Sequence, residues 1–118
     1  MIRKSSILIT GAGGEVGSQL IDHFSHKQNI NIVTLDLHPI RSDKVSDQIT
    51  GNILDQSLLD QINLEFEITE IYHLAAILST RAELSPKSAH DVNVNGSINL
   101  LELALKQSKS QNRRVKFF

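Results

Sequence analysis

Three glycines near the start of the chain constrain its fold more than any other feature. They occupy positions 11, 14 and 17, after an apolar run at residues 6–10. We expect Gly11 to permit a tight turn out of a strand, Gly14 to let a ligand approach the backbone, and Gly17 to let a helix lie close to a sheet. The N–H groups and partial positive charge of the first helical turn would then hold the phosphates of a dinucleotide.

The residues around the glycines support this interpretation. A helix after the turn is predicted by apolar residues at helical spacing, namely Val16, Leu20, Ile21 and Phe24. A second apolar run at residues 30–37 has Asp36 near its end, where the ribose-binding acid of dinucleotide-binding folds lies. A glycine-rich turn alone can serve any tight strand-to-helix connection, so the order of strand, turn, helix, strand and acid carries the argument.

Length and composition exclude several other classes of function. The chain has 118 residues, 40% hydrophobic and 21% charged, as expected of a single globular domain. A formal net charge of −1 gives no electrostatic case for nucleic acid or an anionic membrane as main partner. The chain has no cysteine, which fits a cytoplasmic location. Apart from the loose pair His23 and His26, its five histidines lack ligand spacing, so we expect no metal site. The N-terminal apolar stretch is too short for a signal peptide or a membrane span.

Further along the chain, strands and helices are predicted to alternate. Strands are expected at residues 49–53, 71–76 and 115–118. One helix should follow Asp55 as its N-cap and reach Phe66, and a longer one should run from Pro86 to about Ser108. This alternation indicates an α/β fold of the Rossmann type, with a parallel sheet in the order 3-2-1-4-5 and helices on both faces.

Five motifs in order resemble the extended short-chain dehydrogenase/reductase family, the NAD-dependent epimerase/dehydratase class. They are Thr10-Gly11-x-x-Gly14-x-x-Gly17, Asp36, Gly51-Asn52-Ile53, His73-Leu74-Ala75-Ala76 and Asn93-Val94-x-Gly96. Residues 75–79, followed by Ala82, Glu83 and Pro86, are most similar to the short-chain type of L-threonine 3-dehydrogenase. Sugar-nucleotide epimerases and dehydratases of the UDP-glucose 4-epimerase type share enough of the pattern to remain open. A non-catalytic dinucleotide-binding sensor is a third alternative.

The resemblance implies roles for individual residues. The pyrophosphate would lie along Gly11, Gly14, Glu15, Val16 and Gly17, the adenosine ribose against Asp36 and Leu37, and the adenine beside Asn52 and Ile53. The nicotinamide half would pass Leu74, Ala75, Ala76 and Leu78. Asn93 matches the family's supporting active-site asparagine, and Ser79 and Thr80 match positions that meet a small-molecule substrate. His73 is interpreted as a strand residue with satisfied hydrogen bonds.

The cofactor is expected to be NAD rather than NADP. The carboxylate of Asp36 would repel the 2′-phosphate of NADP, whereas the cation of Arg41 argues the other way. Two positions depart from the family pattern: Asn52 replaces a common aspartate, and Glu15 places a carboxylate beside the pyrophosphate, so its side chain should point to solvent.

The family's catalytic Ser/Thr and Tyr-x-x-x-Lys lie beyond the strand predicted to begin at Val115. The one tyrosine here, Tyr72, has no lysine four residues later. Residues 1–118 are therefore expected to form the NAD-binding N-terminal part of a longer enzyme, able to bind but not to catalyse. Val115, Phe117 and Phe118 should then form an unpaired apolar edge. We expect either a homo-oligomer, formed by strand pairing or by helix packing near residues 98–118, or disorder of the last residues.

Overall fold

A computed structural model describes residues 4–75, 87 and 90–118. These residues form one parallel sheet of five strands in the order β3-β2-β1-β4-β5, which confirms the predicted Rossmann-type topology. The strands are β1 (Lys4–Thr10), β2 (Asn31–Asp36), β3 (Asp47–Thr50), β4 (Phe66–His73) and β5 (Lys116–Phe117).

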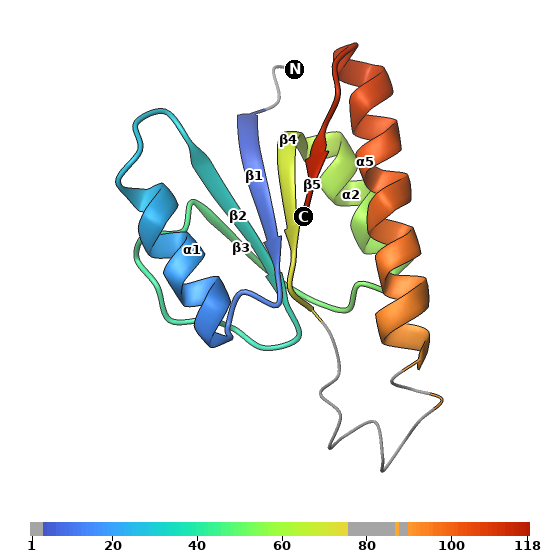
Figure 1. The fold of residues 1–118 in the computed structure, drawn as a ribbon, viewed down its shortest axis with the longest axis horizontal. Helices are drawn as coiled ribbons and strands as arrows, with labels where there is room; N and C mark the ends of the chain where they lie inside the picture. The colour runs from blue at the N-terminus through green and yellow to red at the C-terminus, as the bar shows by residue number, and fades with distance from the viewer. Residues whose placement is uncertain (1–3, 76–86, 88–89) are drawn as a thin grey trace.

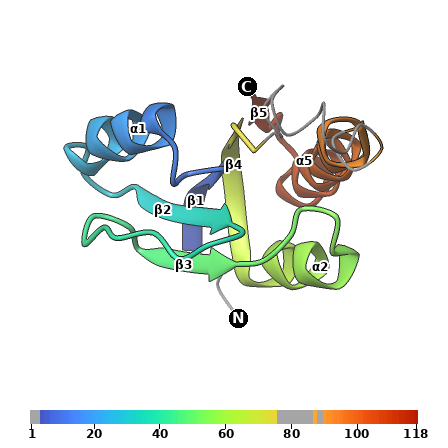
Figure 2. The same cartoon turned by 90° about the horizontal axis from the view of Figure 1, so that it is seen from below.

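Helices cover both faces of the sheet. Helix α1 (Glu15–Ser25) packs on one face, and α2 (Gln56–Glu65) and α5 (Ser97–Gln111) pack on the other (Figures 1 and 2). A π-helical segment, η1 (Asp91–Gly96), leads directly into α5. Within the described residues, no helix is long and apolar enough to cross a membrane.

The apolar runs of β1 and β2 form the centre of two hydrophobic clusters. Alternate side chains of a strand point to opposite faces, so Ile7, Ile9 and Ile32 contact the α1 side while Leu8 and Val33 contact the α2 and α5 side. Residues 7–9 of β1 and 32–35 of β2 are covered on both faces, which explains why all of them except Thr34 are apolar.

Helix α1 presents only part of its predicted apolar face to the sheet. Ile21 and Phe24 are buried, Leu20 is half-buried, and Val16 is 57% exposed. The side chain of Val16 is therefore not part of the core and lies beside the glycine turn.

Several element boundaries differ from those predicted. The Asp55 side chain caps α2 by accepting a hydrogen bond from the Leu58 N–H at 3.3 Å, as predicted, but the helix ends at Glu65 and Phe66 is already extended. Strand β4 therefore begins at Phe66, five residues before the predicted Ile71. The third strand likewise lies at Asp47–Thr50 rather than at residues 49–53.

Two glutamines of α5 explain how β4 can begin so early. The fully buried Gln107 accepts a hydrogen bond from the Ile68 N–H at 3.0 Å and donates to the Phe66 carbonyl at 2.9 Å. Gln111 donates to the Ile68 carbonyl at 2.6 Å. Pairing of the C-terminal segment with β4 begins at Glu70 and continues to His73, so these amides satisfy the backbone at residues 66–68, where β5 does not reach.

Strand β5 is the last strand of the described sheet, but the prediction of an exposed apolar edge is wrong for Val115. Val115 is buried in the core, and Phe117 packs against the same cluster. Phe118 is exposed, and its ring stacks on Tyr72 with 4.9 Å between the ring centroids. Val115 directly precedes β5 and belongs to the same cluster as Leu103 and Ala104 of α5. Its N–H donates a hydrogen bond to the Ser108 hydroxyl of α5 at 3.0 Å, which ties this residue to the helix.

Candidate cofactor site at the glycine turn

The carboxyl ends of β1, β2 and β4 meet at one edge of the sheet, the lower edge in Figure 1. At this edge Gly11 has φ of +66°, and its N–H donates to the Leu35 carbonyl at 3.0 Å. A β-carbon built on Gly11 would lie 2.6 Å from the Ala75 nitrogen. Both the left-handed conformation and the close approach of Ala75 require glycine here.

Gly14 and Gly17 meet very different surroundings. A β-carbon on Gly17 would lie 2.5 Å from the Ala12 carbonyl oxygen, so this glycine lets α1 pack against the backbone of the turn itself. A β-carbon on Gly14 would contact only the Gly11 carbonyl oxygen, at 3.7 Å, among the residues the structure describes. The space beside Gly14 is therefore open to a ligand.

Helix α1 begins without a side-chain cap from any described residue. Gly14 is its N-cap, and the following residues Glu15 and Val16 are exposed. The first N–H groups of a helix have no acceptor within the helix and carry its partial positive charge. This open, uncapped turn fits a phosphate group, and its residues are those predicted to hold the pyrophosphate.

Asp36 faces the glycine turn from the end of β2. One carboxylate oxygen accepts a hydrogen bond from the Gly13 N–H at 2.9 Å, and the other accepts from the His38 N–H at 3.2 Å. Two backbone donors thus fix the carboxylate plane and leave lone pairs on both oxygens. Leu37 is exposed beside it.

Gly13 is a site residue that the sequence interpretation missed. A β-carbon on it would lie 3.1 Å from the Asp36 carboxylate, so a larger residue would disturb the hydrogen bond that its N–H donates. The extra glycine between Gly11 and Gly14 was the available signal for this contact.

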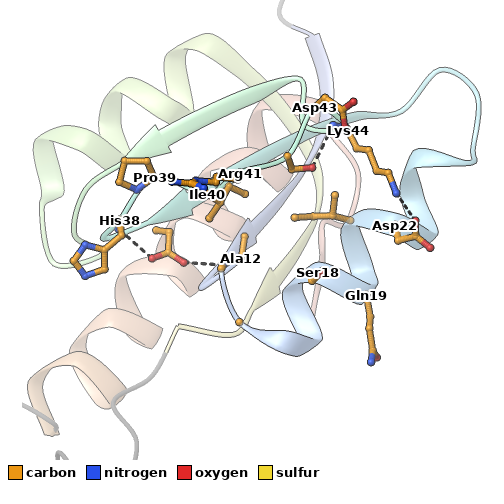
Figure 3. Close-up of a pocket in the computed structure, with 15 residues that line it drawn as sticks. Ala12, Ser18, Gln19, Asp22, His38, Pro39, Ile40, Arg41, Asp43 and Lys44 are labelled. Carbon is orange, nitrogen blue, oxygen red and sulfur yellow. Dashed lines mark hydrogen bonds and ion pairs between the residues drawn. The ribbon is translucent and has the colours of Figure 1, made fainter.

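A cleft of about 1000 Å³ extends from the glycine turn between α1 and the loop at residues 38–44. Figure 3 shows Ser18, Gln19 and Asp22 of α1 on one side and His38 to Lys44 of the loop on the other. Gln48 holds this loop through two hydrogen bonds to the backbone of Ile40, at 2.6 and 2.9 Å. The cleft and its loop were also missed, because their walls meet only in the folded chain.

An exposed ion pair closes the far end of the cleft. The Lys44 ammonium group lies 2.5 Å from an oxygen of Asp22. This hydrogen bond and the charge attraction lower the pKa of Asp22 and raise the pKa of Lys44. Both groups are charged at neutral pH and neutralise each other, so they add little net charge to the cleft.

The predicted adenine-side residues are only partly available to a ligand. Gly51 N–H donates to the Asp36 carbonyl at 2.9 Å, which brings this segment next to the acid. Asn52 is exposed, but its side-chain oxygen accepts a hydrogen bond from the Leu54 N–H at 2.9 Å. The Ile53 side chain is buried in the core and packs beside Gly96, so only the backbone of Ile53 could contact an adenine ring.

The predicted nicotinamide-side residues follow β4. Leu74 and Ala75 are half-buried, and Leu74 N–H donates to the Thr10 carbonyl at 3.0 Å. Asn93 is exposed on η1. The other predicted positions, Ala76, Leu78, Ser79 and Thr80, lie outside the described residues, as does Pro86.

Two further side chains on β4 carry perturbed pKa values. Burial, together with a hydrogen bond to Glu70 at 3.0 Å, raises the pKa of Tyr72 to about 12, so its hydroxyl stays protonated at neutral pH. Burial lowers the pKa of His73, whose ring nitrogens lie 2.7 Å from the Thr10 hydroxyl and 3.0 Å from the Ser97 hydroxyl. His73 is thus fully hydrogen-bonded, in agreement with its interpretation from the sequence.

Comparison with known proteins identifies the family to which this site belongs. A model of the NAD-dependent epimerase/dehydratase family matches residues 7–118. The chain belongs to this family. Membership implies a nicotinamide dinucleotide as cofactor, and the motif resemblance stated from the sequence is confirmed.

Similar proteins include both enzymes and family members of unassigned activity. An uncharacterised epimerase/dehydratase of Staphylococcus aureus is 32% identical over 102 residues, which cover 83% of this chain and 32% of that protein. A solved monomeric L-threonine 3-dehydrogenase from a metagenome is 38% identical with a TM-score of 0.73, covering 95% of this chain and 34% of that one. The UDP-glucose 4-epimerase of Thermotoga maritima, at 24% identity and a TM-score of 0.76, shares the fold over 86% of this chain and 34% of its own. The chain thus spans about a third of the length of these relatives.

The different surroundings of the two glycines predict different costs of substitution. Gly17→Ala should lower the free energy of unfolding by about 1–3 kcal/mol, because the new methyl group overlaps the Ala12 backbone. Gly14→Ala should change it by less than about 0.5 kcal/mol, because its methyl group enters open space. Urea denaturation of the two variants checks this, and equal losses would show that both glycines serve only packing.

Proposed function

We propose that this chain binds NAD(H) across the glycine turn. The observation that carries the proposal is the uncapped N-terminus of α1 facing the Asp36 carboxylate across Gly13. The pyrophosphate would lie in the open space beside Gly14 and accept hydrogen bonds from the N–H groups of Glu15, Val16 and Gly17. Gly11 shapes the turn, and its carbonyl accepts a hydrogen bond from the Gly14 N–H at 3.3 Å. Leu74, Ala75 and Asn93 would then lie along the nicotinamide half, with Asn52 and Ile53 near the adenine.

We further propose a preference for NAD(H) over NADP(H). The carboxylate oxygens of Asp36 keep lone pairs for the two ribose hydroxyls, and their charge would repel a 2′-phosphate. Arg41 lies in the loop at residues 38–44, across the cleft from α1 (Figure 3). Its positive charge is the one that could offset the repulsion of a 2′-phosphate by Asp36. Arg41 is exposed, whereas Asp36 is held by two backbone donors, so the acid should dominate.

For the whole protein we propose hydride transfer between NAD and a hydroxyl-bearing carbon of a small molecule. A nicotinamide dinucleotide supplies the hydride acceptor when bound, and the residues described here would bind and orient it. A threonine 3-dehydrogenase-like oxidation is the leading reaction, with Ser79 and Thr80 as substrate contacts. The first alternative is an enzyme that epimerises or dehydrates a sugar nucleotide. The second alternative is a sensor that binds the dinucleotide without turnover. Assays of the full-length protein with L-threonine and with UDP-glucose separate these three outcomes.

Titration calorimetry with both cofactors tests the binding site. The chain should bind NAD(H) at least about tenfold more tightly than NADP(H), because of the charge of Asp36. Asp36→Asn keeps the shape but removes the charge, and should bring the two affinities within about threefold of each other. Gly14→Val should abolish binding without unfolding the chain, since its side chain fills the open space. Equal affinity of the unmodified chain for both cofactors would refute the role of Asp36.

We also propose that the chain self-associates through α5. Four apolar side chains follow one face of η1 and α5 at spacings of four, three and four residues, and each is 40–57% exposed: Val94, Ile98, Leu101 and Leu105. Residues at this spacing form a stripe that can pack against a second helix. Ile98, Leu101 and Leu105 lie within residues 98–118, near which association was predicted, whereas Val115 is buried.

Light scattering after size-exclusion chromatography tests the association. The average mass should rise toward twice that of one chain as the concentration increases, and Leu101→Glu should abolish the rise. Leu64→Glu is the matched control, because Leu64 is an exposed leucine on α2 outside the stripe. A constant monomeric mass at every concentration would contradict the proposal.

A further inference from the structure

A directed series of hydrogen bonds crosses the edge of the sheet at His73. Ala75 N–H donates to the Thr10 hydroxyl oxygen at 3.3 Å, and that oxygen lies 2.7 Å from His73 Nδ1. On the other side of the ring, His73 Nε2 lies 3.0 Å from the Ser97 hydroxyl, which donates to the Asn93 carbonyl at 2.7 Å. The series therefore joins the glycine turn, the end of β4 and the segment that bears Asn93.

The two ends of this series determine where every proton lies. The Asn93 carbonyl can only accept, so the single Ser97 proton is used there and Ser97 must accept from His73 Nε2–H. A neutral ring protonated at Nε2 has an unprotonated Nδ1, which must accept from the Thr10 hydroxyl. Thr10 then accepts from the Ala75 N–H, as its position requires.

The Ser97 bond lies where α5 begins and the preceding backbone is irregular. Residues Asp91–Gly96 are π-helical, and a π-helical turn places one extra residue in the helix. The orientation of Asn93 on this turn is therefore not set by a regular helical ladder alone. Its carbonyl is held by the Ser97 hydroxyl, which is in turn held by the ring of His73.

We propose that His73 is a positioning residue of the dinucleotide site, fixed as the Nε2–H tautomer, and that it sets the Asn93 turn relative to Ala75 and the glycine turn. Its effect on binding rests on the dinucleotide site proposed above, whereas the tautomer and the coupling between the three segments do not. The ring touches no cofactor and takes part in no reaction; it acts through Thr10 and Ser97.

Protonation of the ring would break this arrangement. A proton on Nδ1 would make that atom a donor, and the Thr10 hydroxyl proton would lose its acceptor. Among the described residues the ring contacts Thr10 of β1, Ser97 of α5 and Phe117 of β5, none of which ionises. Burial lowers the pKa of His73, in the direction that keeps the ring neutral.

Nitrogen-15 NMR of the imidazole rings tests the tautomer without any cofactor. His73 should show a protonated Nε2 and an unprotonated Nδ1, and at about pH 6.5, where an ordinary histidine is half protonated, a smaller fraction of it should be protonated. His38, whose ring is exposed, serves as the internal reference for a ring in contact with solvent. A protonated Nδ1, or a rapid average of both tautomers, would overturn the proposal.

A pair of serine variants on one helix tests the positioning role. Ser97→Ala should shift the amide signals of Thr10 and Ala75 across the ring and weaken NAD binding by about three- to tenfold, the effect of one lost hydrogen bond. Ser108→Ala is the control, because Ser108 also donates to the carbonyl four residues earlier, at 2.8 Å, and accepts one N–H, but lies far along α5. Ser108→Ala should leave both measurements unchanged.

The outcomes separate the two proposals. If the unmodified chain does not bind NAD, the proposed function fails, while the tautomer and the amide shifts still decide the role of His73. If Ser97→Ala leaves the amides of Thr10 and Ala75 unchanged, or if Ser108→Ala weakens binding equally, His73 has no positioning role.

Discussion

The close approach of two strand ends at Gly11 is the constraint on which the site depends. The Gly11 N–H bonds to Leu35 of β2, while the Thr10 carbonyl accepts from Leu74 after β4, so the end of β1 is tied to both neighbours. Any β-carbon at position 11 would overlap the backbone of Ala75. The chain must therefore leave the sheet through a left-handed turn, and α1 begins uncapped above the strand ends.

This geometry places two groups of opposite preference in one cleft. The uncapped start of α1 favours an anion, and the Asp36 carboxylate favours hydrogen-bond donors. Because Gly13 N–H connects them directly, a ligand that satisfies both must carry phosphate and hydroxyl groups a short distance apart. A dinucleotide has this arrangement in its pyrophosphate and adenosine ribose, which supports the proposed binding of NAD(H) at this turn.

The sequence predicts the sheet order and the glycine turn well, because both follow from local patterns. Apolar runs mark β1 and β2, and the spacing of glycines to Asp36 reflects one strand–helix–strand unit. The start of β4 was not predictable in this way, since Glu67 and Glu70 interrupt its apolar residues and Gln107 replaces a neighbouring strand. The contact of Gly13 with Asp36 and the identity of the residues that hydrogen-bond to His73 were missed because these contacts join segments distant in sequence.

The most direct test of the account is an amide NMR titration of the chain with NAD. The account predicts that the largest shifts fall on the amides of residues 13–17, where the pyrophosphate would bind, and on those of Asp36 and Leu37. Shifts confined to another surface, such as the hollow near Thr69, Arg113 and Lys116, would contradict it. So would NAD-induced shifts of unchanged size in Gly14→Val, because that side chain closes the space beside the turn.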